Sequence, residues 1–202
     1  MGLEVKADPR SDQRDHVLGV AARLFSEQGF DDVTMADIAK AAGVARATVF
    51  NYFGSKHAVV EEITEVVIAF YRGMLDQALA DEITSTPDLM RTLFADMGEG
   101  IEADRRFYRG VFREIARIQL GLDEGGVAQR ANEQTKERLV ALVRRGQARG
   151  ELRTEIAPEV LAAAFHSLSN GTITDWLYSE STESLAARMR EAAEVLLLGG
   201  TA

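Results

Sequence analysis

The sequence predicts an all-α fold in which a small three-helix head with a helix-turn-helix precedes a larger helical body. Apolar residues recur at three-and-four spacing along most of the chain, as at Val17, Ala21 and Leu24, which is the period of an amphipathic helix. The chain has only 3 prolines, and alternating β-branched runs that would indicate strands are missing. Hydrophobic residues make up 46% of the 202 residues, so the chain can bury a substantial core.

We expect three parts along the chain: a flexible arm over residues 1–11, the head over residues 12–57, and the body over residues 58–202. The stretch MGLEVKADPRS at the start is polar and charged, which is typical of an unpacked terminus. The first predicted helix follows it and ends near Gly29, because glycine readily makes the left-handed turn that terminates a helix.

The second predicted helix begins after Thr34. The threonine oxygen can accept free backbone N–H groups, and Asp37, three residues on, is favoured beside the positive end of the helix. Gly43 is predicted to end this helix with a tight turn. Two short helices joined in this way form a helix-turn-helix, whose second helix is slender enough to enter the major groove of DNA.

That second helix is predicted over residues 45–53, ARATVFNYF. At helical spacing Val49 and Phe53 share one side, with Phe50 near them, and this side suits packing against the other helices. The opposite side is left with residues that suit a groove, because small side chains keep it slim, arginine can bond guanine, and threonine and asparagine can bond base edges or phosphates. These residues are Ala45, Arg46, Ala47, Thr48, Asn51 and Tyr52.

The next helix is predicted to begin after Ser55, which can cap it, with Lys56 beside its N-terminus. Backbone N–H groups and an ammonium together would make a phosphate clamp. In the body, Pro87 and Pro158 each read as the first turn of a helix, and the GLDEGG stretch at residues 121–126 reads as a loop between two long helices.

Acidic residues predominate in the body. Residues 57–202 hold 16 Lys and Arg against 24 Asp and Glu, whereas residues 1–56 hold 7 against 8. Between Ile38 and Val60 no Asp or Glu occurs. The net charge of -9 would repel nucleic acid, but attraction depends on the local field, because salt screens charges beyond roughly 10 Å. A face that tolerates DNA is therefore compatible with an acidic protein.

The ordered pattern VTMADIAKAAGVARATVFNYFGSK, preceded by a helix ending in Gly-Phe, resembles the DNA-binding head of the TetR family of bacterial transcriptional regulators. The resemblance is specific over residues 12–60. It implies phosphate contacts from Thr34, Tyr52 and Lys56. It also implies a groove-reading surface made by Ala45, Arg46, Ala47, Thr48 and Asn51. Many members have tyrosine where this chain has Phe50, which lacks the hydroxyl and is assigned to packing or apolar contact.

The same resemblance implies a homodimer through the last two helices, a near-palindromic double-stranded operator, and a small-molecule effector in the body. The helix over residues 158–178 supports pairing independently, because it lacks a broad polar face and a partner subunit could cover it. Its two neighbouring apolar or small lines are Leu161, Phe165, Leu168, Thr172 and Trp176, and Val160, Ala164, Ser167 and Gly171.

Candidate effector contacts come from two predicted helices. Apolar walls with a few polar anchors are typical of a ligand pocket, although each of these residues singly is more often a core, interface or ion-pair residue. The candidates are Phe107, Tyr108, Phe112, Arg113, His166, Asn170 and Trp176.

Two other classes of function stay open on the sequence. One is a constitutive DNA-binding or chromosome-organising dimer without an effector. The other is an enzyme, which is disfavoured because no HExxH, GxxxxGK or nucleophile motif occurs. No catalytic residue, metal or cofactor is therefore expected. The absence of cysteine, of an apolar signal and of a membrane-length apolar run favours a soluble, cytoplasmic protein without a membrane partner.

Overall fold

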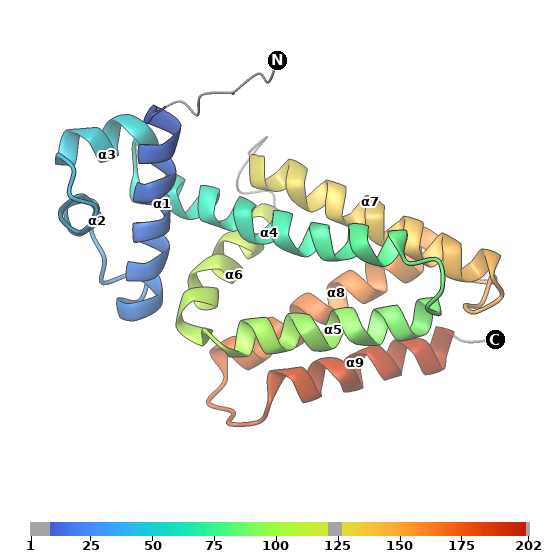
Figure 1. The fold of residues 1–202 in the computed structure, drawn as a ribbon. Coiled ribbons are helices and arrows are strands. Elements are labelled where there is room, and N and C mark those ends of the chain that lie inside the picture. Colours follow the sequence, from blue (N-terminus) through green and yellow to red (C-terminus); the bar gives the residue numbers. More distant parts are fainter. Residues whose placement is uncertain (1–8, 121–126, 201–202) are drawn as a thin grey trace, which may run out of the picture.

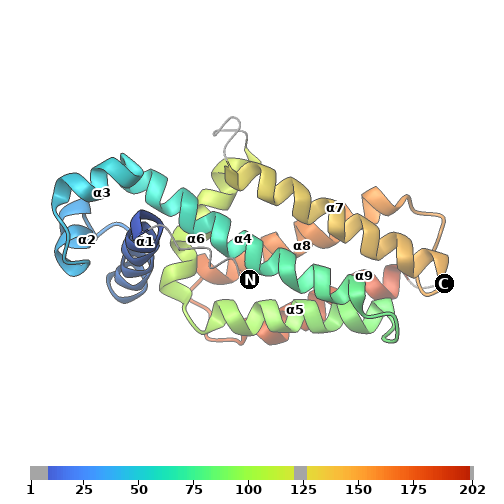
Figure 2. The same ribbon diagram turned by 45° about the horizontal axis from the view of Figure 1, so that its top comes forward.

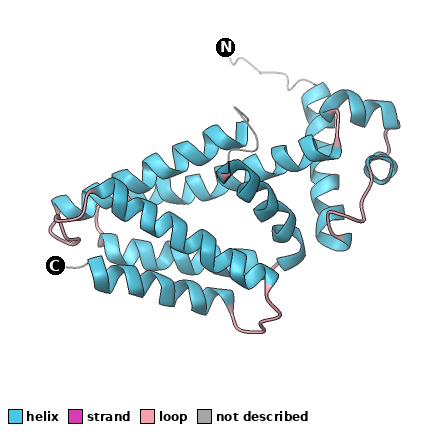
Figure 3. Ribbon diagram, turned by 180° about the vertical axis from the view of Figure 1, so that it is seen from behind, coloured by secondary structure: helices cyan, strands magenta, loops and turns pink. Residues whose placement is uncertain are grey.

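The computed structural model describes residues 9–120 and 127–200, and these fold into α-helices without a strand (Figure 3). The all-α prediction is confirmed. The helices of the described part are α1 (Pro9–Gln28), α2 (Met35–Ala41), α3 (Arg46–Phe53), α4 (Lys56–Ala80), α5 (Thr86–Glu102), α6 (Arg105–Gln119), α7 (Val127–Ala148), α8 (Pro158–Tyr178) and α9 (Leu185–Gly200).

Several boundaries follow from local sequence signals. Pro87 and Pro158 lie in the first turns of α5 and α8, as predicted. Helix α1 begins at Pro9, so the last residues of the expected arm are helical, while residues 1–8 lie outside the described residues. The loop expected at residues 121–126 also lies outside them.

Helix α1 and the short helices α2 and α3 gather at one end of the molecule, and we call them the head (Figure 1). Helix α4 starts in the head and continues without interruption along the body, which is formed by α5–α9 with the rest of α4 (Figures 1 and 2). Helix α4 packs beside α7, α5 packs beside α9, and α6 contacts α1. The head is thus attached to the body both through α4 and through α6.

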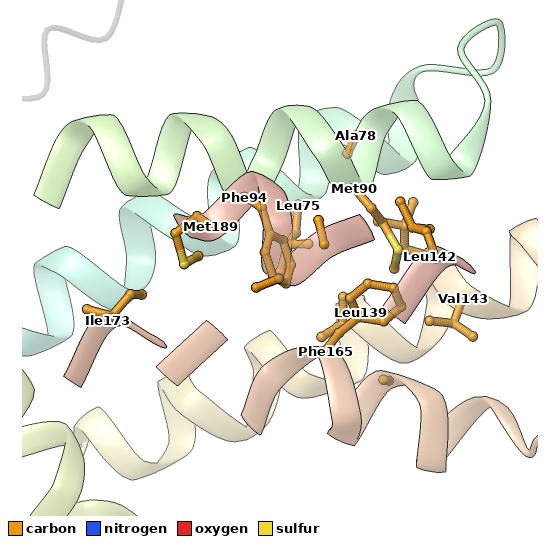
Figure 4. Close-up of a cluster of buried hydrophobic side chains, with 14 of the residues drawn as sticks. Leu75, Ala78, Met90, Phe94, Leu139, Leu142, Val143, Phe165, Ile173 and Met189 are labelled. Atoms are coloured by element: carbon orange, nitrogen blue, oxygen red, sulfur yellow. The ribbon is translucent and has the colours of Figure 1, made fainter. Parts of the chain in front are cut away.

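Each part has its own apolar core. The head core contains residues of α1–α3, the first turns of α4, and Val111 from α6, which is 2% exposed. The body core joins α4–α9, and Figure 4 shows Leu75, Met90, Phe94, Leu139 and Phe165 gathered at its centre. Burial of this apolar surface is the main stabilising contribution to each part.

Helices α5 and α9 approach closely at Gly98. A Cβ atom built on Gly98 would lie 2.7 Å from Cα of Ala186, a separation that two carbon atoms cannot adopt. Glycine is therefore required here by backbone proximity and not by a turn. The contact fixes α9 against α5 and so determines where the outer face of α9 lies.

Candidate nucleic-acid interface and ligand cavity

The start of α2 has the predicted cap, and both partners contribute. Thr34 Oγ1 accepts the N–H of Asp37 at 3.2 Å, and the carboxylate of Asp37 accepts the N–H of Thr34 at 2.9 Å. This reciprocal arrangement is a capping box. The hydrogen bonds from Thr34 hold the pKa of Asp37 below its ordinary value. The acid nearest the recognition segment is therefore engaged in holding the helix.

The turn between α2 and α3 is made by Gly43, whose φ of +67° lies in the left-handed region. The N–H of Val44 donates to the carbonyl of Ala39 at 3.0 Å and closes the turn. Ala45 is the N-cap residue of α3, so α3 begins one residue later than the sequence indicated. The predicted helix-turn-helix is present in the structure.

The two sides of α3 differ as its sequence predicts. Val49 is fully buried and Phe53 is 8% exposed in the head core. The candidate groove-reading residues lie on the other side, where Ala45, Arg46, Ala47 and Asn51 are exposed and Thr48 and Tyr52 are half-buried. No acidic residue occurs in α3. A slender, acid-free surface is therefore presented outward.

Phe50 was assigned to packing or apolar contact, and of these two the packing in the head core is not found. Phe50 is 39% exposed, and the guanidinium carbon of Arg46 lies 5.3 Å from the centre of its ring. The four-residue separation places both side chains on one face of the helix. Phe50 thus belongs to the outward surface, where it supports the arginine through a cation–π contact.

Tyr52 and Lys56 make contacts that local spacing does not reveal. The hydroxyl of Tyr52 donates to Oε1 of Gln13 on α1 at 2.7 Å. Nζ of Lys56 donates to the carbonyls of Phe30 at 2.6 Å and Val33 at 2.8 Å. Nζ of Lys56 is therefore directed into the α1–α2 connection. Ser55 caps α4 as predicted, accepting the N–H of Ala58 at 3.1 Å.

The seven candidate effector contacts do not form one pocket. Phe107 packs against the head core, Phe112 is buried in the body core, and Arg113 bonds Asp31 in the head. Trp176 is buried, with its Nε1–H donating to the carbonyl of Glu183 at 2.7 Å. Helix α6 lies between the head and the body core, so its aromatic side chains pack against one or the other. The sequence of α6 alone does not show this position.

The body instead encloses a different cavity, of about 60 Å³, between α4, α5, α7 and α8. Only His166 of the seven candidates lines it. His166 and Asn170 also line an open groove beside α6 and α7, and Tyr108 reaches the cavity wall through a 3.4 Å contact with the hydroxyl of Tyr71. The cavity is lined by Tyr71, Met74, Leu75, Met90, Leu93, Phe94, Met97, Thr135, Leu139, Phe165, His166 and Ser169.

The cavity carries no charge at neutral pH. Burial lowers the pKa of His166 to about 4, with a smaller contribution from Lys136. Burial, and then the neighbouring Tyr108, raise the pKa of Tyr71. The only polar groups in the wall are therefore a neutral imidazole and three hydroxyls. Such a site favours apolar molecules that accept or donate one or two hydrogen bonds.

The low pKa of His166 predicts a loss of stability in mild acid. Folding favours the neutral imidazole, so its contribution is complete above the unfolded pKa of 6.5 and is lost as the pH falls toward 4. We expect the free energy of unfolding to fall by about 2 kcal/mol from this group between pH 7 and 4.5. Urea unfolding of the native chain and of His166→Gln at both pH values measures this change in the free energy of unfolding. An equal loss in both proteins would contradict this assignment.

Comparison with known proteins agrees with this arrangement. Residues 17–63 match the sequence model of the family described as bacterial regulatory proteins, tetR family. The chain is 27% identical over 156 residues to the HTH-type transcriptional repressor KstR2 of Mycolicibacterium smegmatis, covering 77% of this chain and 75% of that protein. It is 43% identical over 67 residues to the putative mycofactocin biosynthesis transcriptional regulator MftR of Mycobacterium tuberculosis, over 33% and 34% of the two chains.

The fold of the whole chain is shared with a solved regulator. FadR of Thermus thermophilus, a TetR-family transcriptional repressor solved in complex with lauroyl-CoA, superposes with a TM-score of 0.70 and 25% identity, over 92% of this chain and 94% of FadR. The structural match to FadR covers both head and body, whereas the family sequence model covers only residues 17–63. Residues 17–63 thus match the TetR family of bacterial transcriptional regulators, and the chain shares its fold with a solved repressor of that family.

Proposed function

We propose that this protein is a dimeric, sequence-specific repressor of transcription whose head binds a near-palindromic operator. The outward surface of α3 carries the proposal, because it combines small side chains with Arg46, Thr48 and Asn51 and has no acid. Arginine bonds two acceptors of guanine, and asparagine and threonine bond other base edges. Thr34 and Tyr52 flank this surface as phosphate contacts. Residues 12–57 act as the DNA-binding part and residues 58–202 as the ligand-binding and dimerisation part.

The outer faces of α8 and α9 are the proposed dimer surface. Val160 on α8 is 61% exposed, and Val195 and Leu198 on α9 are 67% and 75% exposed. A Cβ on Gly171 would meet nothing within 4 Å, which leaves room for a close helix approach. Leu161, Phe165 and Trp176, in contrast, are buried in this chain's own core, so the proposed partner covers the other side of α8. Twofold pairing sets two recognition helices about 34–36 Å apart.

The cavity between α4, α5, α7 and α8 is the proposed effector site. Its walls are apolar and include Met74, Met90 and Met97, whose flexible side chains can move aside for a ligand. A cavity of about 60 Å³ is smaller than the usual ligand site of about 300–1,000 Å³, so binding must widen it. A ligand that binds the widened body more tightly lowers the affinity of the protein for DNA. Bound DNA then lowers the affinity for the ligand by the same factor.

Selection of bound fragments from random DNA tests the core of this proposal. We expect recovery of a near-palindrome with half-sites about one helical turn apart. Lauroyl-CoA, which FadR carries, is a first probe for the cavity, and its effect is read as loss of operator binding. Tight operator binding that no bound ligand weakens would indicate a constitutive DNA-binding dimer and contradict the effector site.

Arg46→Ala tests base recognition within the selected operator. We expect a loss of about 1–3 kcal/mol in operator binding and blurred preference at one base position, because a bidentate contact to guanine is removed. Titrations of operator and random DNA at several salt concentrations measure this. Arg23→Ala on α1, whose side chain is 59% exposed and pairs with Glu27, is the matched control and should leave binding unchanged. An equal loss on both DNAs for Arg46→Ala would make Arg46 a phosphate contact instead.

A further inference from the structure

Helices α4, α5 and α6 contact one another and border an open groove of about 460 Å³. This volume lies within the range of about 300–1,000 Å³ that is usual for a small-molecule site. The groove differs from the effector cavity proposed above, although Tyr71 and Met74 line both and form a shared wall. Among the described residues, α8 and α9 contribute nothing to its lining. The groove is therefore distinct from both the cavity and the proposed dimer surface.

Three aromatic side chains line the groove, Phe70 and Tyr71 from α4 and Tyr108 from α6. Phe70 is 65% exposed. The rings of Phe70 and Tyr71 lie edge to face with their centres 5.5 Å apart, and the hydroxyls of Tyr71 and Tyr108 are 3.4 Å apart. An aromatic ring attracts a cation to its face, and several rings around one space favour alkylated ammonium groups. The rings thus suit an organic cation.

Asp96 of α5 gives the groove a negative charge, and it is the only charged residue in the described lining. Its side chain is exposed and makes no ion pair or hydrogen bond with another described residue. Other acids of the same helix are paired, because Asp88 bonds Arg91 and Glu99 bonds Arg190, each at 2.8 Å. A single carboxylate beside three rings attracts a cation and repels an anion.

The arginines of α4 and α6 that lie nearest to the groove in the sequence are engaged elsewhere. Nη1 of Arg72 on α4 donates to Oε1 of Gln134 on α7 at 2.8 Å. Nε of Arg109 on α6 donates to the carbonyl of Leu177 at 2.7 Å. Neither guanidinium lines the groove. The charge of the groove therefore stays negative in the described part of the chain.

Two glycines keep the groove open. Gly73 on α4 and Gly100 on α5 both line it. A Cβ on Gly73 would meet nothing within 4 Å, and a Cβ on Gly100 would meet only the hydroxyl oxygen of Tyr71, at 3.8 Å. A long side chain at Gly100 would therefore extend into the space beside Tyr71. Replacement of Gly100 thus offers a way to fill the groove without changing its charge or its rings.

We propose that this groove is a second small-molecule site, which binds an organic cation with a methylated ammonium group. The ammonium lies against the rings of Phe70 and Tyr71, and the carboxylate of Asp96 supplies the opposite charge. The side-chain amide of Gln77, at the edge of the groove, accepts a hydrogen bond from a hydroxyl of the ligand. The net charge of -9 favours cations near the protein surface. The site goes beyond the effector cavity and does not depend on DNA binding.

Choline and its neutral analogue, in which a tert-butyl group replaces the trimethylammonium group, test the proposal because they share one shape and differ in charge. Their binding to the full chain is followed by nuclear magnetic resonance, through the amide signals of isotopically labelled Gly73 and Gly100. We expect choline to shift both signals and to bind at least about five-fold more tightly than the analogue at low salt, the effect of one opposite charge at about 4 Å in water. Gly150, in the turn after α7, is the reference signal and should not shift.

Replacements in the groove identify the groups that bind the cation. Asp96→Asn should weaken choline binding about five-fold at low salt and remove most of its salt dependence. Phe70→Leu should weaken it about two- to five-fold, as expected for one exposed cation–π contact. Gly100→Leu should abolish the shift at Gly73 by filling the groove. Asp32→Asn, at an exposed position between α1 and α2, is the matched control, since it removes a carboxylate outside the groove and should leave choline binding unchanged.

Equal binding of choline and its neutral analogue would overturn the cation site and leave only an apolar groove. Unshifted signals of Gly73 and Gly100 at about 50 mM choline, well above the dissociation constant of about 1 mM for a weak site, would overturn it too. Choline shifts that persist unchanged in both Asp96→Asn and Phe70→Leu would contradict the assigned contacts. None of these outcomes depends on whether the protein selects an operator, so this site and the repressor function can fail separately.

Discussion

Replacing Lys56 with methionine is expected to destabilise the head by about 2 kcal/mol. The Lys56 ammonium donates hydrogen bonds to the carbonyls of Phe30, Asp31 and Val33, at 2.6, 3.3 and 2.8 Å. A hydrogen bond from a charged group contributes about 1.5–3 kcal/mol, and methionine leaves these acceptors without their donor. Because Lys56 directly follows the Ser55 cap, loss of the contact also removes one of the links between the end of α3 and the α1–α2 connection.

Hydrogen exchange of the head amides measures the loss of stability. Titrations of operator DNA at several salt concentrations show whether Lys56 acts by positioning the head or by contacting phosphate. A loss of positioning weakens binding with little change in the salt slope. A lysine that contacted phosphate would instead leave head protection unchanged and reduce the slope by about one when replaced, and that outcome would contradict our interpretation. Lys40→Met, at an exposed position in the last turn of α2, is the matched control for simple removal of a positive charge from the head.

Replacing Gly98 with valine is expected to lower the free energy of unfolding by about 3 kcal/mol. The new Cβ would lie 2.7 Å from Cα and 3.0 Å from N of Ala186. These are backbone atoms of α9, which cannot rotate away as a side chain does. Overpacking of this kind costs about 1–3 kcal/mol, and more where the backbone must shift. Urea unfolding measures the loss, and sedimentation shows whether displacement of α9 also disrupts the proposed dimer.

Gly73→Ala on α4 is the matched control for Gly98→Val. A Cβ at Gly73 meets nothing within 4 Å, so alanine gains helix propensity without a clash and should stabilise the protein by about 0.5–1 kcal/mol. If Gly98→Val unfolds at the same urea concentration as the native chain, the close contact between α5 and α9 is not as the structure describes it.

The helices of the head could be read from the sequence because their signals are local. The capping box joins Thr34 to a residue three positions away, and Gly43 makes its turn by its own backbone preference. The sides of α3 follow from the helical period, which placed Val49 and Phe53 inward. Phe50 lies at the border between the two sides of the helix. Whether its side chain is buried depends on how far the head core extends, and the local sequence does not show that.

The body's candidate site could not be read in the same way. Arg113 looked like an anchor in an aromatic pocket, but its partner Asp31 is 82 residues away in the chain. The cavity is bordered by four helices, so its wall depends on how these pack together. Its methionines and leucines look like ordinary core residues in the sequence. Only His166 was found, because a histidine on an otherwise apolar helix is conspicuous.

The unbroken course of α4 from head to body constrains how such proteins can be recombined. Each residue of an α-helix turns the chain by about 100°. Inserting or deleting a single residue in the part of α4 (Lys56–Ala80) that lies in the body would therefore rotate the head about the helix axis by about 100° relative to the body. A chimera that joins this head to another body must therefore preserve the helical phase at the junction. Exchanges that keep the residue count should retain the native orientation of the head relative to the body, and those one residue out should not.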